Sequence, residues 1–183
     1  MSTLSQNYWI WVFGEIQALR WVCEHNTMAF GAHATKVLTR ARPGDQALLY
    51  VTQGARHRPN RDVSRLAGLA SIVTEPAATQ GELVVAGRQF SWSCAIQVDI
   101  LLPENTGPVI ADLVDQLDLV TKANAWGAYF HRSPILINEH DFRVLAGALE
   151  RFTKRTDIVP QRGVFPDLSK PTHVSGPHVI NAG

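Results

Sequence analysis

The sequence predicts an α+β domain in which a small curled, mostly antiparallel sheet or open barrel carries helices packed outside it. Several apolar or alternating runs have the length of strands, and the connections between them are short enough for antiparallel pairing. A few other stretches repeat their apolar residues at helical spacing. The chain has 183 residues, of which 45% are hydrophobic and 18% charged. That size and composition fit a single hydrophobic core.

The first part of the chain predicts a buried strand followed by short helical pieces. Tyr8–Phe13 are six consecutive large apolar residues, which is typical of a central strand buried on both faces. Glu15–Asn26 places apolar residues at helical spacing and predicts an amphipathic helix. Met28–His33 predicts a turn or a short extended piece, and Thr35–Ala41 predicts one or two helical turns that end before Pro43.

The middle of the chain predicts further strands. Gln46–Thr52 is a strong apolar strand, and Gln53–Ser64 has the polar composition of an exposed loop. Leu66–Thr74 is the next strand, in which Gly68 predicts a bulge or the close approach of another backbone. The small residues that follow show only a weak preference for any secondary structure. Phe90–Leu102 then alternates well enough to form a strand with one buried face.

The last third predicts two helices around a short strand. Pro108–Val120 carries apolar residues on one stripe and three aspartates opposite, which predicts an amphipathic helix with a solvated acidic face. A short strand follows near Ile135–Ile137. Asn138 is then an N-cap, with Asp141 three residues later as in a capping box, and the last helix runs to Phe152.

These elements predict one domain over residues 1–152 and a tail over residues 153–183. The tail is rich in proline, glycine and polar residues and contains few apolar anchors. Such a composition predicts a segment that is draped on the domain surface or partly mobile.

Charge is unevenly distributed along the chain, although the formal net charge is only +1. Residues 36–65 have a local balance of +5, whereas residues 104–150 have a balance of −4. One face is therefore expected to suit phosphates. The phosphate-binding candidates lie in or beside the 53–64 loop: Arg56, Arg58, Arg61 and Arg65. They form either a phosphate-tracking surface or simply a solvated, flexible loop.

No pattern in the sequence predicts a metal, a cofactor or a catalytic group. The seven histidines lack metal-ligand spacing, and no Ser-His-Asp grouping, phosphate-cradling glycine loop or paired-carboxylate motif stands out. We therefore expect a non-catalytic protein without metal or cofactor. Cys23 and Cys94 are expected to be small core residues. With no signal peptide and no 18-residue apolar run, the sequence predicts a soluble cytoplasmic protein without a membrane partner.

The segment 126–142, WGAYFHRSPILINEHDF, combines an aromatic ring, a glycine and a planar cation. A flat ring beside a guanidinium group is suited to binding a flat ligand. Trp126 is alternatively a core residue that holds the last strand to the sheet. Arg132 is alternatively a surface cation that pairs with Asp141 or Glu139.

Four segments resemble the EVE domains of the PUA-like superfamily, relatives of the YTH readers of methylated adenine in RNA. The resemblance spans about residues 8–152 and rests on YWIWVF, PGDQALLYVTQG, LAGLASIVTEP and WGAYFHRSPILINEHDF. It implies a curled PUA-like sheet and an aromatic pocket, beside a basic surface, that holds a modified base. The implied partner is DNA or RNA.

Position by position, the resemblance implies a base-binding pocket. Phe30, shortly after the first helix, is the candidate stacking ring, and the backbone of Gly31 is a candidate base-edge contact. The full set is Phe13, Gly14, Phe30, Gly31, Phe90, Trp92, Trp126, Arg132 and Ser133.

The leading hypothesis is thus a non-catalytic module that binds a modified nucleobase. Stacking on an aromatic ring contributes about 1–3 kcal/mol per base and tolerates different bases, so specificity must come from polar groups at the base edge. One alternative is a small PUA-like hydrolase, similar to the ASCH amidohydrolases, for which Lys36, Thr39 and Glu75 are present but not in a matching motif. Another is a protein-interaction module whose pocket is vestigial.

Overall fold

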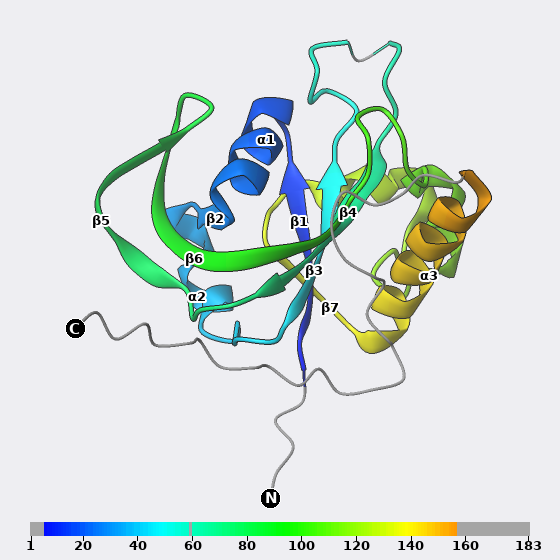
Figure 1. Ribbon diagram of the computed structural model, residues 1–183. Helices are drawn as coiled ribbons and strands as arrows, with labels where there is room; N and C mark the ends of the chain where they lie inside the picture. The colour runs from blue at the N-terminus through cyan, green and yellow to red at the C-terminus, as the bar shows by residue number, and fades with distance from the viewer. Residues whose placement is uncertain (1–5, 59, 157–183) are drawn as a thin grey trace, which may run out of the picture.

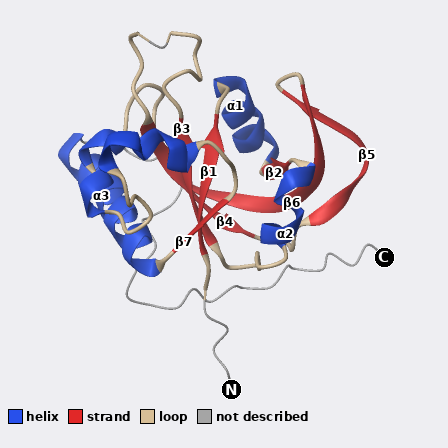
Figure 2. Cartoon of the chain, turned by 180° about the vertical axis from the view of Figure 1, so that it is seen from behind, coloured by secondary structure: helices blue, strands red, loops and turns tan. Residues whose placement is uncertain are grey.

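The computed structural model describes residues 6–58 and 60–156 of the chain (Figures 1 and 2). The elements are β1 (Tyr8–Phe13), α1 (Ile16–His25), β2 (Thr27–Phe30), the 3₁₀ helix η1 (Ala32–Ala34), α2 (Thr35–Leu38), β3 (Gln46–Val51), β4 (Arg65–Ile72), β5 (Ala77–Val85), β6 (Arg88–Leu101), the 3₁₀ helices η2 (Ile110–Asp112), η3 (Val114–Gln116) and η4 (Ala123–Phe130), β7 (Ile135–Ile137) and α3 (Glu139–Thr156). In the described part of the chain, no helix has both the length and the apolar character needed to cross a bilayer.

The seven strands form one curled sheet in the order β2-β6-β4-β3-β1-β7, with β5 paired to β6 off this path. The long strand β6 bends strongly, so that β5 and β2 carry the sheet around α1 (Figure 1). The result is a half-barrel with helices outside, which confirms the predicted α+β class. All strand pairs are antiparallel except β1 and β3, which run parallel with Tyr8 opposite Gln46 and Phe13 opposite Val51. The sheet is thus mostly antiparallel, as predicted, with this one parallel pair.

β1 is buried on both faces of the sheet, which explains its uninterrupted apolar run. Trp9, Trp11 and Phe13 point into a core shared with α1. Ile10 points the opposite way into a second core shared with α3. Because successive strand residues face opposite sides, a strand between two helical layers must be apolar at every position.

Gly68 in β4 confirms the predicted close approach of another backbone. A Cβ atom at this position would collide with the carbonyl oxygen of Ile100 in β6. The register of β4 against β6 shifts directly afterwards, between Leu69 and Ala70.

The start of α3 has half of the predicted capping box. The Asn138 side-chain oxygen accepts the backbone N–H of Asp141 at 2.8 Å, as an N-cap does. The Asp141 carboxylate instead accepts the backbone N–H groups of Asp118 and Leu119 at 2.7 and 2.9 Å. This acid therefore ties the preceding segment to the helix rather than closing the box.

The predicted amphipathic helix over Pro108–Val120 is wrong. The segment forms two short 3₁₀ turns, η2 and η3, with Leu113 between them at φ −117°. Its apolar residues do face one core, as the stripe indicated. Valine, isoleucine and aspartate are weak helix formers, and the bonds from Asp141 turn the chain just after η3.

Two other elements differ from the expectation. β5 lies in the stretch of small residues whose sequence shows only a weak preference for any secondary structure. Its pairing with β6, and not its own residue pattern, makes it a strand. α3 continues to Thr156, so Thr153–Thr156, which we expected in the tail, are helical. The rest of the predicted tail lies outside the described residues.

Candidate ligand-binding cavity

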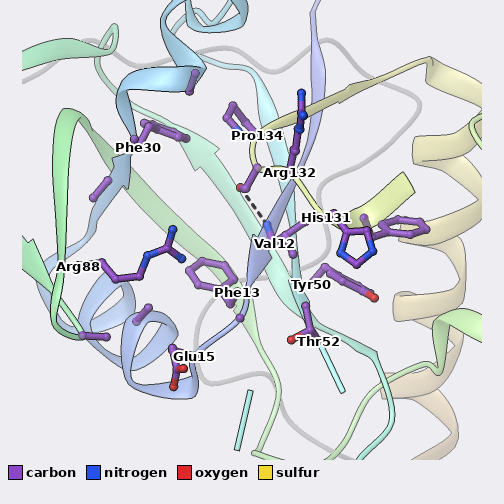
Figure 3. Close-up of a pocket in the computed structure, with 18 of the residues that line it drawn as sticks. Val12, Phe13, Glu15, Phe30, Tyr50, Thr52, Arg88, His131, Arg132 and Pro134 are labelled. Carbon is purple, nitrogen blue, oxygen red and sulfur yellow. Dashed lines mark hydrogen bonds between the residues drawn. The ribbon is translucent and has the colours of Figure 1, made fainter. Parts of the chain in front are cut away.

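A cavity of about 1030 Å³ opens where β1 and β3 end side by side (Figure 3). Its walls come from α1, the segment from β2 to η1, the tip of the β5–β6 hairpin and the segment between η4 and β7. Five parts of the chain that are distant in sequence thus meet at one rim of the sheet. The volume is sufficient for a small organic ligand.

The pocket residues predicted from the sequence converge on this cavity with one exception. Eight of the nine line it: Phe13, Gly14, Phe30, Gly31, Phe90, Trp126, Arg132 and Ser133. Trp92 does not. It lies opposite Phe30 in the β2–β6 pair and packs, half-buried, against the core on the α1 side. The alternation of β6 placed Phe90 and Trp92 on one face, but the strand bends (Figure 1), and only Phe90 reaches the cavity.

The aromatic residues of the cavity fall into two groups. Phe13 and Phe30 are core residues with 3% and 2% exposure, and Phe30 meets Trp11 edge to face with 5.9 Å between ring centroids. Phe90 and Trp126 are only half-buried. The ring of Phe30 is therefore already packed in the cavity wall, and Phe90 and Trp126 offer the more accessible aromatic surface.

Trp126 unites the two roles that the sequence left as alternatives. It packs against the core on the α3 side and lies edge to face with Phe130 at 6.0 Å. It also lines the cavity. The core contact fixes the ring, and the remaining half-exposed surface is available to a ligand.

The loop between η4 and β7 is fixed by two hydrogen bonds of Ser133. The Ser133 hydroxyl accepts the backbone N–H of Val12 in β1 at 3.0 Å, drawn as the dashed line in Figure 3. Its carbonyl oxygen lies 3.1 Å from His33 Nε2 in η1. Ser133 thus joins three walls of the cavity, and its neighbour Arg132 is held at the rim.

Arg132 is exposed and forms no ion pair within the described residues. The alternative pairing with Asp141 or Glu139 is wrong, because Glu139 pairs with Arg143 at 2.6 Å and Asp141 binds backbone N–H groups. The guanidinium group is therefore available for an external partner.

Arg88 is a cavity residue that the sequence analysis missed. It opens β6 directly after the turn at Ala86 and Gly87, and its side chain extends into the cavity (Figure 3). A signal was present in the sequence, since the alternation of Trp92 and Phe90 continues backward to Arg88.

The four candidate phosphate-binding arginines are divided between an exposed loop and a second cavity. Arg58 and Arg61 are exposed on the loop before β4. Arg56 and Arg65 line a second, smaller cavity of about 270 Å³ on another side of α1. There Arg65 donates to the carbonyl oxygen of Gly107 at 2.8 Å. The set is therefore divided between a solvated loop and a separate hollow, and none of it lines the large cavity.

The large cavity contains one carboxylate, and that group already has a partner. Glu15 lies 2.9 Å from His57 Nε2. Tyr50 also lines the cavity, and burial raises its pKa while a hydrogen bond with Ser64 acts in the opposite direction. The Tyr50 hydroxyl is therefore protonated at neutral pH. The electrostatic character of the cavity is set by its two arginines.

The residues of the amidohydrolase alternative lie elsewhere. Lys36 and Thr39 are exposed on and after α2, and Glu75 is exposed after β4. None of the three lines the large cavity. The Thr39 hydroxyl is bonded to the carbonyl oxygen of Lys36 at 2.8 Å, as a local helix-end contact.

Asp118, His140 and Asp141 form a cluster whose ligand atoms lie within 4.8 Å of one another. These atoms serve the fold. Asp141 binds two backbone N–H groups, and His140 Nε2 lies 3.1 Å from the carbonyl oxygen of Gln116. The cluster sits at the start of α3, and its residues do not line the large cavity.

The half-barrel is shared with solved structures of low sequence identity. The Mmi1 YTH domain, solved in complex with RNA, has a TM-score of 0.55 and 12% identity over 86% of this chain and 85% of that one. The YTH domain of Zygosaccharomyces rouxii MRB1, in complex with N6-methyladenosine RNA, has a TM-score of 0.54 and 12% identity over 81% and 88%. This is the YTH/PUA-like fold.

A bacterial protein with the same architecture is Rpa0253 from Rhodopseudomonas palustris, with a TM-score of 0.54 and 16% identity over 79% of this chain and 94% of that one. No protein-family model matches the sequence, and no curated protein matches it either. At these identities the likeness establishes the arrangement of the sheet and helices.

Proposed function

We propose that this protein is a PUA-like, EVE-type module that binds a single nucleobase, a modified one, of DNA or RNA without chemical reaction. The base enters the large cavity and lies against Phe90 and Trp126. We place this activity in the cytoplasm, consistent with the two free cysteines, Cys23 and Cys94.

One observation carries the proposal. The cavity combines two half-buried aromatic rings with a guanidinium group at the rim that has no ion pair among the described residues, and eight of the residues expected from the EVE resemblance line it. Aromatic rings bind the flat faces of a base, and arginine suits the phosphates beside it. The two YTH domains compared above were both solved with RNA, and that of MRB1 with N6-methyladenosine RNA.

Binding is favoured over hydrolysis by the position of three side chains. Lys36, Thr39 and Glu75 lie outside the cavity lining. Among the described residues, the one lining carboxylate is that of Glu15, and it lies beside His57.

The test is fluorescence anisotropy with short RNA and DNA oligonucleotides, each with and without a methylated base. We expect Phe90→Ala to weaken binding by about 5- to 150-fold, which corresponds to the loss of about 1–3 kcal/mol of stacking. Trp92→Ala is the matched control, because it removes a half-buried ring from the same strand outside the cavity. We expect the folded Trp92→Ala variant to bind the oligonucleotides with nearly the same affinity as the parent.

A methyl group buried against the rings adds about 1 kcal/mol, so we expect about fivefold preference for the methylated base. Circular dichroism and thermal unfolding establish that each variant is folded. Absence of binding to every oligonucleotide at low salt would refute the proposal. Equal loss in Phe90→Ala and Trp92→Ala would refute the placement of the base.

A further inference from the structure

The tip of the β5–β6 hairpin fixes the direction of Arg88. Ala86 and Gly87 both have positive φ, at 49° and 74°, and they join Val85 directly to its cross-strand partner Arg88. Two consecutive residues with positive φ form the tight turn that matches the twist of a hairpin. Paired residues lie on the same face of the hairpin, and so does Phe90, two residues after Arg88.

That face is the wall of the cavity. Val85 is 2% exposed and lines it, as do Arg88 and Phe90. Figure 3 shows the Arg88 side chain running from the hairpin toward Phe13 in the cavity wall. The backbone of the turn therefore presents Arg88 beside the accessible aromatic ring of Phe90.

The charge around Arg88 is uncompensated. Within the described residues it takes part in no ion pair, and neither does Arg132 across the cavity. The single lining acid, Glu15, lies beside His57. Two guanidinium groups that line one cavity, neither with an ion pair among the described residues, attract an anion.

We propose that Arg88 binds the phosphate attached to the nucleotide whose base occupies the cavity, so that the ligand is recognised as a nucleotide and not as a free nucleoside. This inference rests on the proposed function and adds the class of ligand and a specificity-determining residue. A guanidinium group donates two parallel N–H bonds to phosphate oxygens, and it does so best where the side chain is held in place. The turn sets the direction in which the backbone presents the side chain here.

The first test is the salt dependence of oligonucleotide binding, measured for the parent, Arg88→Gln, Arg88→Lys and the control Arg155→Gln. Arg155 is exposed in the last turn of α3 and is not among the cavity residues. We expect Arg88→Gln to weaken binding on the order of tenfold at low salt. For a single-stranded ligand it should reduce the slope of log affinity against log salt by about 0.7, the loss of one phosphate contact.

Arg88→Lys should retain the slope, because it keeps the positive charge, while losing part of the affinity. The control should match the parent in both. An unchanged slope in Arg88→Gln, with the parent still binding, would overturn the inference and leave the proposed function intact.

The second test compares a nucleoside with its monophosphate, titrated into the same proteins and followed by NMR chemical shifts. The parent should bind the monophosphate more tightly, and Arg88→Gln should lose most of that preference. Equal weakening of both ligands by Arg88→Gln would show a contact to the base or a structural effect and would overturn the inference. Failure of the parent to bind oligonucleotides, nucleoside and monophosphate alike would instead refute the proposed function.

Discussion

Replacing Ser133 by alanine tests whether one hydroxyl group holds the cavity together. The substitution removes the acceptor of the Val12 backbone N–H, a part-buried bond of 3.0 Å between the loop and β1. A buried N–H group left without a partner costs about 1–3 kcal/mol. Since the site is part-buried we expect about 2 kcal/mol, and for a chain of this size that lowers the melting temperature by about 4–8 °C.

The same change should weaken ligand binding beyond its effect on stability, because the loop that carries Arg132 loses its attachment to the sheet. Calorimetric or fluorescence-monitored thermal unfolding measures the first effect, and anisotropy at a temperature where the variant is fully folded measures the second. Ser133→Thr is the control, since it keeps a hydroxyl acceptor and should stay close to the parent. Parental melting temperature and parental affinity in Ser133→Ala would refute the reasoning.

Three further predictions concern the rest of the fold. Gly68→Ala should be strongly destabilising, because the added Cβ meets the carbonyl oxygen of Ile100; a denaturant midpoint equal to that of the parent would contradict this close approach. Burial raises the pKa of Cys23 to about 11 and that of Cys94 to about 12, so both thiols should be protonated near pH 8. Both should therefore react with an alkylating reagent far more slowly in the native protein than in urea. Equal reaction rates would show that the thiols are accessible. Burial raises the pKa of Asp99 above its value in the unfolded chain. The ionised carboxylate therefore lowers the stability of the folded protein. This loss of stability is absent below the unfolded-state pKa and complete above the folded-state pKa. Asp99→Asn should therefore gain stability relative to the parent as pH rises from about 3 to about 7, measured by urea unfolding, and a pH-independent difference would contradict this.

The strands of the sheet could largely be predicted, because burial on two faces leaves a plain pattern. Tyr8–Phe13 and Gln46–Val51 are apolar at nearly every position, and both are central strands. Their parallel pairing could not be predicted from that pattern, since it does not encode the direction of the neighbouring strand. Ala77–Val85 was missed because its order comes from β6.

The helical spacing of apolar residues also gave a wrong prediction for the segment before η4, Pro108–Val120. Apolar residues three and four positions apart fit an α-helix, but a chain of 3₁₀ turns satisfies the same contacts with the core, as Leu113 and Leu117 do. The deciding contact is the carboxylate of Asp141, which binds two backbone N–H groups more than twenty residues earlier. No local pattern reports a bond of that range.

The eight lining residues that were predicted could be predicted only because a family resemblance supplied them. Phe13 and Phe30 are indistinguishable from core residues by composition, and the structure shows that they are both. Trp92 was placed with Phe90 by the same resemblance, but only Phe90 lines the cavity. Arg88 was overlooked because a lone arginine beside a turn resembles any solvated charge until the opposite wall is known.

The helix α1 separates two hollows and presents a different stripe to each. Ala18 and Val22 face the large cavity, whereas Leu19, Arg20 and Cys23 line the smaller one. Substitutions of residues that line one cavity can change its shape while the other cavity keeps its lining, because the two sets of residues do not overlap. The ten-residue helix α1 thus lines two cavities, and substitutions in it can change each cavity separately.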